Sequence, residues 1–344
     1  MSVLVKTPKF WFRKNHPAAL ALAPLGMIYN LGVKARFAVT EPYDSKLPVI
    51  CIGNFTVGGG GKTPLAVEIA GLLVEKGYKP VFLTRGYGGR TRGPHLVEPS
   101  QDSAADVGDE PLILADAAPV VVSADRVAGA RFIEQMQADV IIMDDGFQNP
   151  SLHKDLSLVV VDEVTGVGNG LVFPAGPLRA SLGFQLPKAD ALVISGPVPH
   201  GGEGAILQLE QNFKRQVLRV ELVADGDVDW LKGAQITAVT GIARPDKLYT
   251  SLENRGAIIT QKHEFPDHHM FSEQDARKIM DAAKIDDKPI VMTQKDRVRL
   301  PETGARGELR KKAHVLHVKM QVHEPEKLTL LLEKTISSAT RYSA

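Results

Sequence analysis

The chain has 344 residues, 44% of them hydrophobic, so it is long enough to bury a large core and to form one or two domains. Its 41 basic and 40 acidic residues leave a net charge of +1, which provides no overall attraction to nucleic acid, and we expect no nucleic-acid partner. The one cysteine, Cys51, excludes an intramolecular disulfide framework and any zinc site that needs several cysteines.

The first 40 residues are basic and apolar. Met1–Thr40 contains six basic residues and no acidic one, and Ala18–Val33 within it is apolar apart from Asn30. Sixteen residues fall short of the roughly 20 that span a bilayer. We reject a signal peptide because a nucleotide-binding pattern follows shortly afterwards. Two interpretations stay open: a helix packed on the protein's own core, or an in-plane membrane anchor, which the basic flanks beside Phe10–Phe12 favour.

From Pro48 onward, apolar strands alternate with helices. Pro48–Gly53 is a predicted strand, and Thr63–Gly77 has helical apolar spacing that ends in a glycine. Further strands are predicted within Lys79–Arg90, Ala118–Asp125, Ala138–Gln148, Leu156–Glu163 and Ala189–Ser195, with a helix at Arg126–Gln137. Continuous apolar strands separated by helices predict a mostly parallel sheet that is covered on both faces.

The pattern changes near residue 214. Lys214–Val223 and Ala313–Val322 alternate as extended segments, and a second strand–helix series lies between them. We predict that the two segments pair as a linker between a first domain, residues 41–213, and a smaller α/β domain, residues 214–322. A closing helix at 324–340 is expected to return to the first domain.

A glycine-rich loop connects the first strand to the first helix. It has the G-K-T end of the phosphate-loop pattern, but Thr56 stands where the first glycine of that pattern belongs. The predicted nucleotide-binding residues are Thr56, Val57, Gly58, Gly59, Gly60, Gly61, Lys62, Thr63 and Pro64. Lys62 would reach the β- and γ-phosphates, and the Thr63 hydroxyl would bind Mg²⁺. The predicted fold is therefore an α/β, phosphate-loop NTPase-like sheet with a second, smaller α/β domain.

Two sequence features narrow the class of nucleotide. Val57 stands where partitioning ATPases carry a signature lysine. In the string TQKD, Lys295 directly precedes Asp296, so the spacing of the guanine-recognition motif fails. ATP is the predicted nucleotide. Asp144 and Asp145 end a hydrophobic strand, where phosphate-loop enzymes hold magnesium, and we predict that they bind Mg²⁺.

Two polar loops could supply proton-transfer chemistry. Each is ordinary solvated surface when taken alone, but Asp106–Pro111 and Phe265–His269 together suggest a carboxylate–imidazole pair that takes a proton from an alcohol. Arg85, Arg90 and Arg126 are candidate charge partners for phosphate groups.

Seven strings occur in one order along the chain: GNFTVGGGGKTP, TRGYGG, VGDEP, DDGFQ, GNGLVFPAGPLR, FPDHH and VMTQKD. This set resembles the tetraacyldisaccharide 4′-kinase family from about Cys51 to Asp296. The resemblance implies ATP- and Mg²⁺-dependent transfer of the γ-phosphoryl group to the 4′-hydroxyl of an acylated disaccharide lipid, a lipid A precursor. It also implies that Asp109 and His268 activate that hydroxyl together, and that Lys62 is catalytic.

The implied substrate changes the interpretation of the N-terminus. Because each buried CH₂ is worth about 0.8 kcal/mol, a lipid with several acyl chains stays in the bilayer and the enzyme must come to it. We therefore expect residues 1–40 to associate with the inner-membrane surface, at its cytoplasmic face. No obligate protein partner is implied.

Three departures from the family pattern limit what the resemblance implies. Gly58–Gly61 replaces the usual G-G-T-G, Thr165–Val167 replaces R-G-F so that no arginine role carries over, and Gln294 replaces a glutamate. Two other functions stay open: an ATPase switch that dimerises on nucleotide, and a phosphate-loop kinase or ligase that acts on a soluble small molecule.

Overall fold

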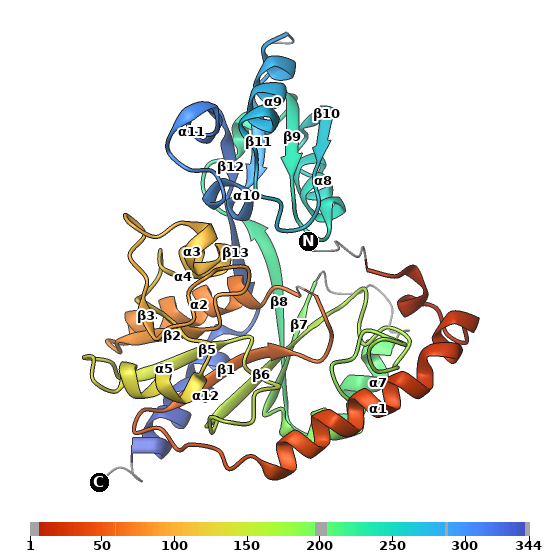
Figure 1. The fold of residues 1–344 in the computed structure, drawn as a ribbon, viewed down its shortest axis with the longest axis vertical. Coiled ribbons are helices and arrows are strands. Elements are labelled where there is room, and N and C mark those ends of the chain that lie inside the picture. Colours follow the sequence, from red (N-terminus) through yellow and green to blue (C-terminus); the bar gives the residue numbers. More distant parts are fainter. Residues whose placement is uncertain (1–6, 59, 197–204, 286–287, 341–344) are drawn as a thin grey trace.

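Two β-sheets organise the chain, one in a large unit and one in a smaller unit above it (Figure 1). The computed structural model describes residues 7–58, 60–196, 205–285 and 288–340. The strand order is β13-β8-β7-β6-β1-β5-β2-β4-β3 in the nine-stranded sheet and β10-β9-β11-β12 in the four-stranded sheet.

The elements have the following bounds. The strands of the large sheet are β1 (Val49–Asn54), β2 (Pro80–Thr84), β3 (His95–Leu96), β4 (Val120–Val122), β5 (Val140–Asp144), β6 (Leu156–Asp162), β7 (Ala191–Ser195), β8 (Gln216–Ala224) and β13 (Val318–Val322). The strands of the small sheet are β9 (Gln235–Thr240), β10 (Ile258–Glu264), β11 (Ile290–Thr293) and β12 (His314–Leu316). The helices are α1 (Pro17–Val39), α2 (Lys62–Glu75), α3 (Ala104–Val107), α4 (Asp109–Leu114), α5 (Arg126–Ile133), α6 (Leu182–Gln185), α7 (Ala205–Asn212), α8 (Pro245–Glu253), α9 (Glu273–Ile285), α10 (Gln294–Val298), α11 (Gly304–Lys312) and α12 (Pro325–Thr340). The described residues also form the short 3₁₀ turns η1 (Lys9–Phe12), η2 (Leu186–Lys188) and η3 (Asp229–Leu231).

The central strands of the large sheet are parallel and buried on both faces. Along β1, Ile50 and Ile52 enter the core that contains α2 and α12, whereas Val49 and Cys51 enter the core that contains α5 and α7. This arrangement confirms the predicted α/β sheet. Because the strands are parallel, the loops after β1, β2, β4, β5 and β6 leave from the same edge, which faces the small unit.

The strands β8 and β13 connect the two units. They pair antiparallel from Val318 opposite Ala224 to Val322 opposite Val220, which confirms the predicted two-stranded linker. The first half of β8 also pairs with β7, so by hydrogen bonding the linker belongs to the large sheet. The domain boundaries at 213/214 and 322 stay a prediction.

The second extended segment, Ala313–Val322, divides between the two sheets. Its first part forms β12, which pairs with β11 in the small sheet, and its second part forms β13. His317 lies between them, where its N–H bonds to Val315 O and its carbonyl accepts the N–H of Asp225. Both parts alternate in hydrophobicity, so the sequence pattern cannot reveal where the chain passes from one sheet to the other.

The helix α1 lies lengthwise along the large unit (Figure 1). By length and composition it is long enough to cross a membrane, because it continues to Val39 beyond the 16-residue apolar stretch. It is nevertheless attached at several points. Gly26 packs against the carbonyl oxygen of Val172, and the side-chain oxygen of Asn30 accepts the N–H of Ser181.

The closing helix α12 packs on the large unit. Leu328, Leu332 and Ile336 join the same hydrophobic core as Ile69 and Leu73 of α2. The C-terminal segment therefore stabilises the large unit, although the small unit separates α12 from the rest of it in sequence.

This packing predicts that α12 stabilises the large unit through one face only. Leu332→Ala should lower the free energy of unfolding by about 2–5 kcal/mol, because it leaves a cavity in the core. Leu330 lies on the same helix but is 68% exposed, whereas Leu332 is 1% exposed. The matched control, Leu330→Ala, should change stability by no more than about 0.5 kcal/mol. Urea denaturation followed by circular dichroism measures both, and equal losses in the two variants would contradict the packing.

Candidate active site

The glycine-rich loop begins α2, as the sequence predicts. Gly61 is the residue before the helix. Its φ of 94° favours glycine, and a side chain there would also come too close to Met320 and Ser195. Lys62 and Thr63 follow as buried residues of the first helical turn. Their backbone N–H groups lie at the helix N-terminus, which attracts phosphate oxygens. Gly59 lies outside the described residues.

The entry to the loop is braced by the segment 177–179. Thr56 forms an isolated antiparallel bridge with Leu178, and the N–H of Val57 donates to Pro177 O at 2.7 Å. The Nε of Arg179 donates to Thr56 O at 3.0 Å. Thr56 is thus held in extended backbone, which does not need the freedom of a glycine. Its departure from the common phosphate-loop pattern has a structural reason.

Pro64 and Lys62 complete the described part of the loop. Pro64 is the third residue of α2, where its missing N–H breaks no helical hydrogen bond. The Nζ of Lys62 lies 3.3 Å from the carbonyl oxygen of Gly58 and 3.6 Å from a carboxylate oxygen of Asp145. Gly60 lies between Gly58 and Gly61 on the loop. The lysine is therefore directed back over the loop, toward the acidic end of β5.

The two aspartates at the end of β5 differ in their surroundings. Arg179 donates one hydrogen bond of 3.0 Å to each carboxylate oxygen of Asp145. Although burial opposes ionisation, the charges of Lys62 and Arg179 lower the pKa of Asp145 below its ordinary value. Asp145 also has φ of 50°, an unusual conformation for a residue other than glycine. It is already paired and held in one orientation.

Asp144 has no such pairing in the described part of the chain. It is 1% exposed, and neither of its carboxylate oxygens has a hydrogen-bond partner among the residues that the structure describes. Burial, followed by the negative charges of Glu110 and Asp145, raises the pKa of Asp144. A buried ionised carboxylate without a partner is unstable unless a proton or a cation neutralises it. This donor fits Mg²⁺, which takes one or two carboxylates and completes its shell with water and phosphate oxygens.

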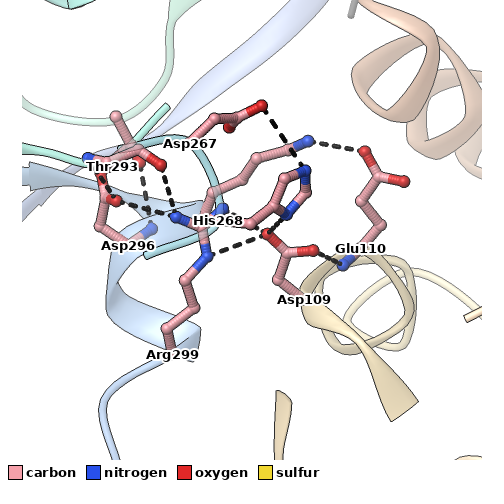
Figure 2. A network of polar contacts seen from close by, with 9 residues as sticks. Asp109, Glu110, Asp267, His268, Thr293, Asp296 and Arg299 are labelled. Carbon is pink, nitrogen blue, oxygen red and sulfur yellow. Dashed lines mark hydrogen bonds and ion pairs between the residues drawn. The ribbon is translucent and has the colours of Figure 1, made fainter. Parts of the chain in front are cut away.

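Asp109 and His268 meet across the two units (Figure 2). Asp109 begins α4, and His268 lies in the loop after β10 with φ of 58°. The Nδ1 of His268 lies 3.1 Å from Oδ2 of Asp109, whose Oδ1 accepts the N–H of Glu110. The two polar loops that the sequence suggested as a pair are thus in contact.

The surroundings shift the pKa values of Asp109 and His268 in opposite directions. Burial opposes ionisation of Asp109, but the hydrogen bond to His268 and the charges of Arg299 and Lys295 outweigh it and hold the pKa well below its usual range. The hydrogen bond to Asp109 raises the pKa of His268, although burial works against this. Asp109 is therefore ionised at neutral pH.

The three candidate phosphate-binding arginines separate in space. Arg90 is exposed and bonds to Asp106, and Arg85 is also exposed. Arg126 is buried at the start of α5, donates to Ser123 O, and has no partner for Nε among the described residues. Burial and the nearby charge of Arg85 lower the pKa of Arg126 to about 10.

Sequence reasoning missed two arginines. Arg179 lies within one of the quoted strings, but nothing in that string indicates that it binds Asp145. Arg299 lies just beyond another string and bonds to Asp109, which is 190 positions away in sequence. Neither contact has a local sequence signal.

Further contacts join the units: Lys295 to Glu110 at 2.7 Å, Gln294 to Asp116 at 2.9 Å, and Lys247 to Asp162 at 2.7 Å.

Because Asp144 has no partner among the described residues, we expect its carboxylate to lower stability when Mg²⁺ is absent and to increase stabilisation by Mg²⁺ with ATP. Without Mg²⁺ and nucleotide, Asp144→Asn should raise the melting temperature by about 2–4 °C, the shift that about 1 kcal/mol produces in a domain of ordinary size. Mg²⁺ with ATP should then stabilise the wild type more than the variant, because the variant lacks the metal ligand. Thermal denaturation measures both effects. Asp44, whose side chain is 84% exposed, supplies the control Asp44→Asn, which should change neither. Equal stabilisation of Asp144→Asn and wild type would argue against the metal role.

Comparisons with known proteins identify the family of this chain. The sequence model of the tetraacyldisaccharide-1-P 4′-kinase family matches residues 18–337. The tetraacyldisaccharide 4′-kinase of Methylobacterium radiotolerans is 44% identical over 325 residues, which cover 94% of this chain and 97% of that protein. The protein of the same name from Parvibaculum lavamentivorans is 42% identical, with 98% and 100% covered.

The crystal structure of LpxK from Aquifex aeolicus in complex with ATP has a similar fold. The TM-score is 0.74 at 25% sequence identity, over 92% of this chain and 99% of that one. These likenesses extend over the whole kinase architecture and do not favour a soluble ligase or an ATPase switch. The chain belongs to the tetraacyldisaccharide 4′-kinase family.

Proposed function

We propose that this chain transfers the γ-phosphoryl group of ATP to the 4′-hydroxyl of a tetraacyldisaccharide 1-phosphate, a lipid A precursor, to give lipid IVA. The observation that carries the proposal is the contact between His268 and Asp109 at the phosphate-loop edge of the large sheet. Glu110, the neighbour of Asp109, lies close enough to Asp144 for its charge to raise the pKa of that carboxyl. A proton acceptor and a nucleotide site thus share one region.

The nucleotide side consists of the phosphate loop and β5. The backbone of Gly58–Gly61 and the N-terminus of α2 would receive the phosphates, and Lys62 would balance charge on the γ-phosphate. Thr63 and Asp144 would hold Mg²⁺, with Asp145 next to them. When bound, the metal neutralises phosphate charge that builds up during transfer. The pairing of Asp145 with Arg179 supports assigning the direct carboxylate contact to Asp144.

The acceptor side consists of His268 and Asp109. Because ionised Asp109 can only accept, Nδ1 of His268 carries the hydrogen of their bond, and Nε2 is left to accept the proton of the 4′-hydroxyl. Asp109 keeps the ring in this orientation and stabilises its positive charge after proton transfer. Nε2 lies 3.7 Å from a carboxylate oxygen of Asp267.

We further propose that α1 lies in the plane of the membrane surface, on the cytoplasmic side of the inner membrane. Its outer face carries large exposed apolar side chains, among them Leu25, Ile28 and Leu31. Its other face contacts the large unit from Gly26 to Phe37, which packs edge-on against Phe184. Because α1 is attached to the large unit along its length, it is better placed to lie on a bilayer surface than to cross the bilayer.

Basic side chains surround the C-terminal half of α1. The ammonium groups of Lys34 and Lys188 both lie over the ring of Phe184, at 5.8 and 4.4 Å from its centroid. Lysine side chains next to aromatic rings suit the headgroup region of an anionic leaflet.

The activity is tested with γ-³²P-labelled ATP and a tetraacyldisaccharide 1-phosphate in mixed micelles. We expect label on the lipid, and a loss of at least about 100-fold in kcat for Lys62→Ala, because the charge on the γ-phosphate is no longer balanced. Lys76, a half-exposed lysine at the end of α2, supplies the control Lys76→Ala, which should keep wild-type kcat. Binding of ATP without labelled lipid would refute the proposed reaction.

Membrane attachment is tested by changing the outer face of α1. The triple substitution Leu25→Gln, Ile28→Gln and Leu31→Gln should weaken binding to vesicles of phosphatidylethanolamine and phosphatidylglycerol by at least about tenfold, since each side chain loses apolar burial. Sedimentation with the vesicles measures the bound fraction. Val74 on α2 is exposed to a similar degree, so Val74→Gln is the control. Undiminished sedimentation of the triple variant would contradict the in-plane anchor.

A further inference from the structure

The string VMTQKD contains an aspartate that the proposed reaction does not use. Asp296 is fully buried in the small unit, yet each of its oxygens is occupied. Oδ1 accepts the N–H of Gly241 at 2.9 Å and the guanidinium of Arg299 at 3.2 Å, and Oδ2 accepts the hydroxyl of Thr293 at 2.6 Å. A buried carboxylate with this many donors is held in one orientation.

Arg299 extends from this carboxylate to the other unit. Its NH1 donates to Asp296 and, at 2.7 Å, to the carbonyl oxygen of Gly241, while Nε at 3.0 Å and NH2 both donate to Oδ2 of Asp109. Its side chain is 1% exposed. Arg299 and His268 both point toward the Asp109 carboxylate (Figure 2). One guanidinium therefore contacts residues of both units.

The same group also supports His268 through the backbone. The carbonyl oxygen of Gly241 accepts the N–H of His268 at 3.1 Å as well as the bond from Arg299, and its N–H donates to Asp296. His268 has a left-handed backbone conformation, which is strained for a residue other than glycine and persists only where neighbours hold it. The peptide of Gly241 supplies that support.

We propose that the buried Asp296–Arg299 pair positions both members of the His268–Asp109 dyad, so that the dyad is assembled only where the two units meet. Arg299 binds the carboxylate of Asp109 directly, and it steadies the backbone of His268 through Gly241. This inference rests on the proposed function, since it assigns Arg299 a positioning role in the same reaction.

The charge of Arg299 has a measurable consequence. His268 is faced by Asp109 from α4, by Asp267 on its own loop, by Arg299 from the small unit, and by the ring of Tyr87 from the loop after β2. The ion pair of Glu110 and Lys295 lies beside Asp109. Arg299 lowers the pKa of His268 and of Asp109, because its positive charge disfavours a second cation and favours an anion. Removal of that charge should raise both pKa values. The base form of His268 would then appear at higher pH.

The test measures kcat, KM for ATP and the pH dependence of kcat in the lipid phosphorylation assay. For Arg299→Gln we expect kcat to fall at least about tenfold with KM for ATP within about threefold, and the acidic limb of the profile to move to higher pH. Arg299→Lys keeps the charge but cannot bond Asp109, Gly241 and Asp296 together. It should lose kcat while the acidic limb stays near that of the wild type, and it provides a second test if Arg299→Gln does not fold.

Arg306 supplies the matched control. It also pairs with a carboxylate within the small unit, Glu273, but touches neither His268 nor Asp109. Arg306→Gln should leave kcat and the pH profile unchanged. Circular dichroism of each variant, with its melting temperature, separates misfolding from a change in the reaction.

A double variant distinguishes positioning from general support of the fold. If Arg299 acts through the dyad, Arg299→Gln combined with Asp109→Asn should be no more than about threefold slower than the slower single variant. Losses that multiply would overturn the inference, as would a folded Arg299→Gln with wild-type kcat and profile. If His268→Gln keeps the wild-type kcat, both the proposed role of His268 and this inference are wrong. If His268→Gln loses activity but Arg299→Gln does not, only the inference is wrong.

Discussion

The carboxylate of Asp109 is the interaction on which the arrangement of the two units depends. It belongs to the large unit, but one of its oxygens accepts from both His268 and Arg299 of the small unit. A buried anion is stable only when donors and cations surround it, and here most of them come from the other side of the interface. Contact between the units therefore stabilises Asp109 and assembles the dyad in the same step. The ion pair of Lys295 and Glu110 lies beside it and reinforces the same contact.

The second buried carboxylate, Asp144, lacks among the described residues the hydrogen-bond donors that surround Asp109. Its neighbour Asp145 takes the available arginine and the nearest lysine, and Asp144 keeps no partner among the described residues. The large unit thus holds an unpaired acid at the end of a hydrophobic strand, at a cost in stability, where a cation and a phosphate group would relieve it. The two adjacent aspartates at this strand end hence have different surroundings, which follow from the positions of Arg179 and Lys62.

Much of the architecture was accessible from the sequence because its signals are local. Buried parallel strands appear as apolar runs, and the Gly61–Lys62–Thr63 turn stands between a strand and a helix as the phosphate-loop pattern requires. The crossing of Ala313–Val322 from one sheet to the other was not accessible, because alternation of apolar residues is the same in both sheets. The length of α1 was underestimated for a related reason: the helix continues through Lys34 and Arg36, which interrupt the apolar pattern but not the backbone.

The sequence by itself determined the chemical groups: a glycine turn with lysine and threonine, an acidic strand end, and two polar loops that contain an aspartate and a histidine. The tertiary structure alone decided how these groups are paired. Arg179 binds Asp145 and leaves Asp144 without a partner among the described residues, and Arg299 joins Asp109 to the backbone that holds His268. Such pairings join residues that are up to 190 positions apart in the chain, and the pKa of a carboxyl depends on which donors surround it in space. A linear pattern contains neither the distance between two side chains nor their burial.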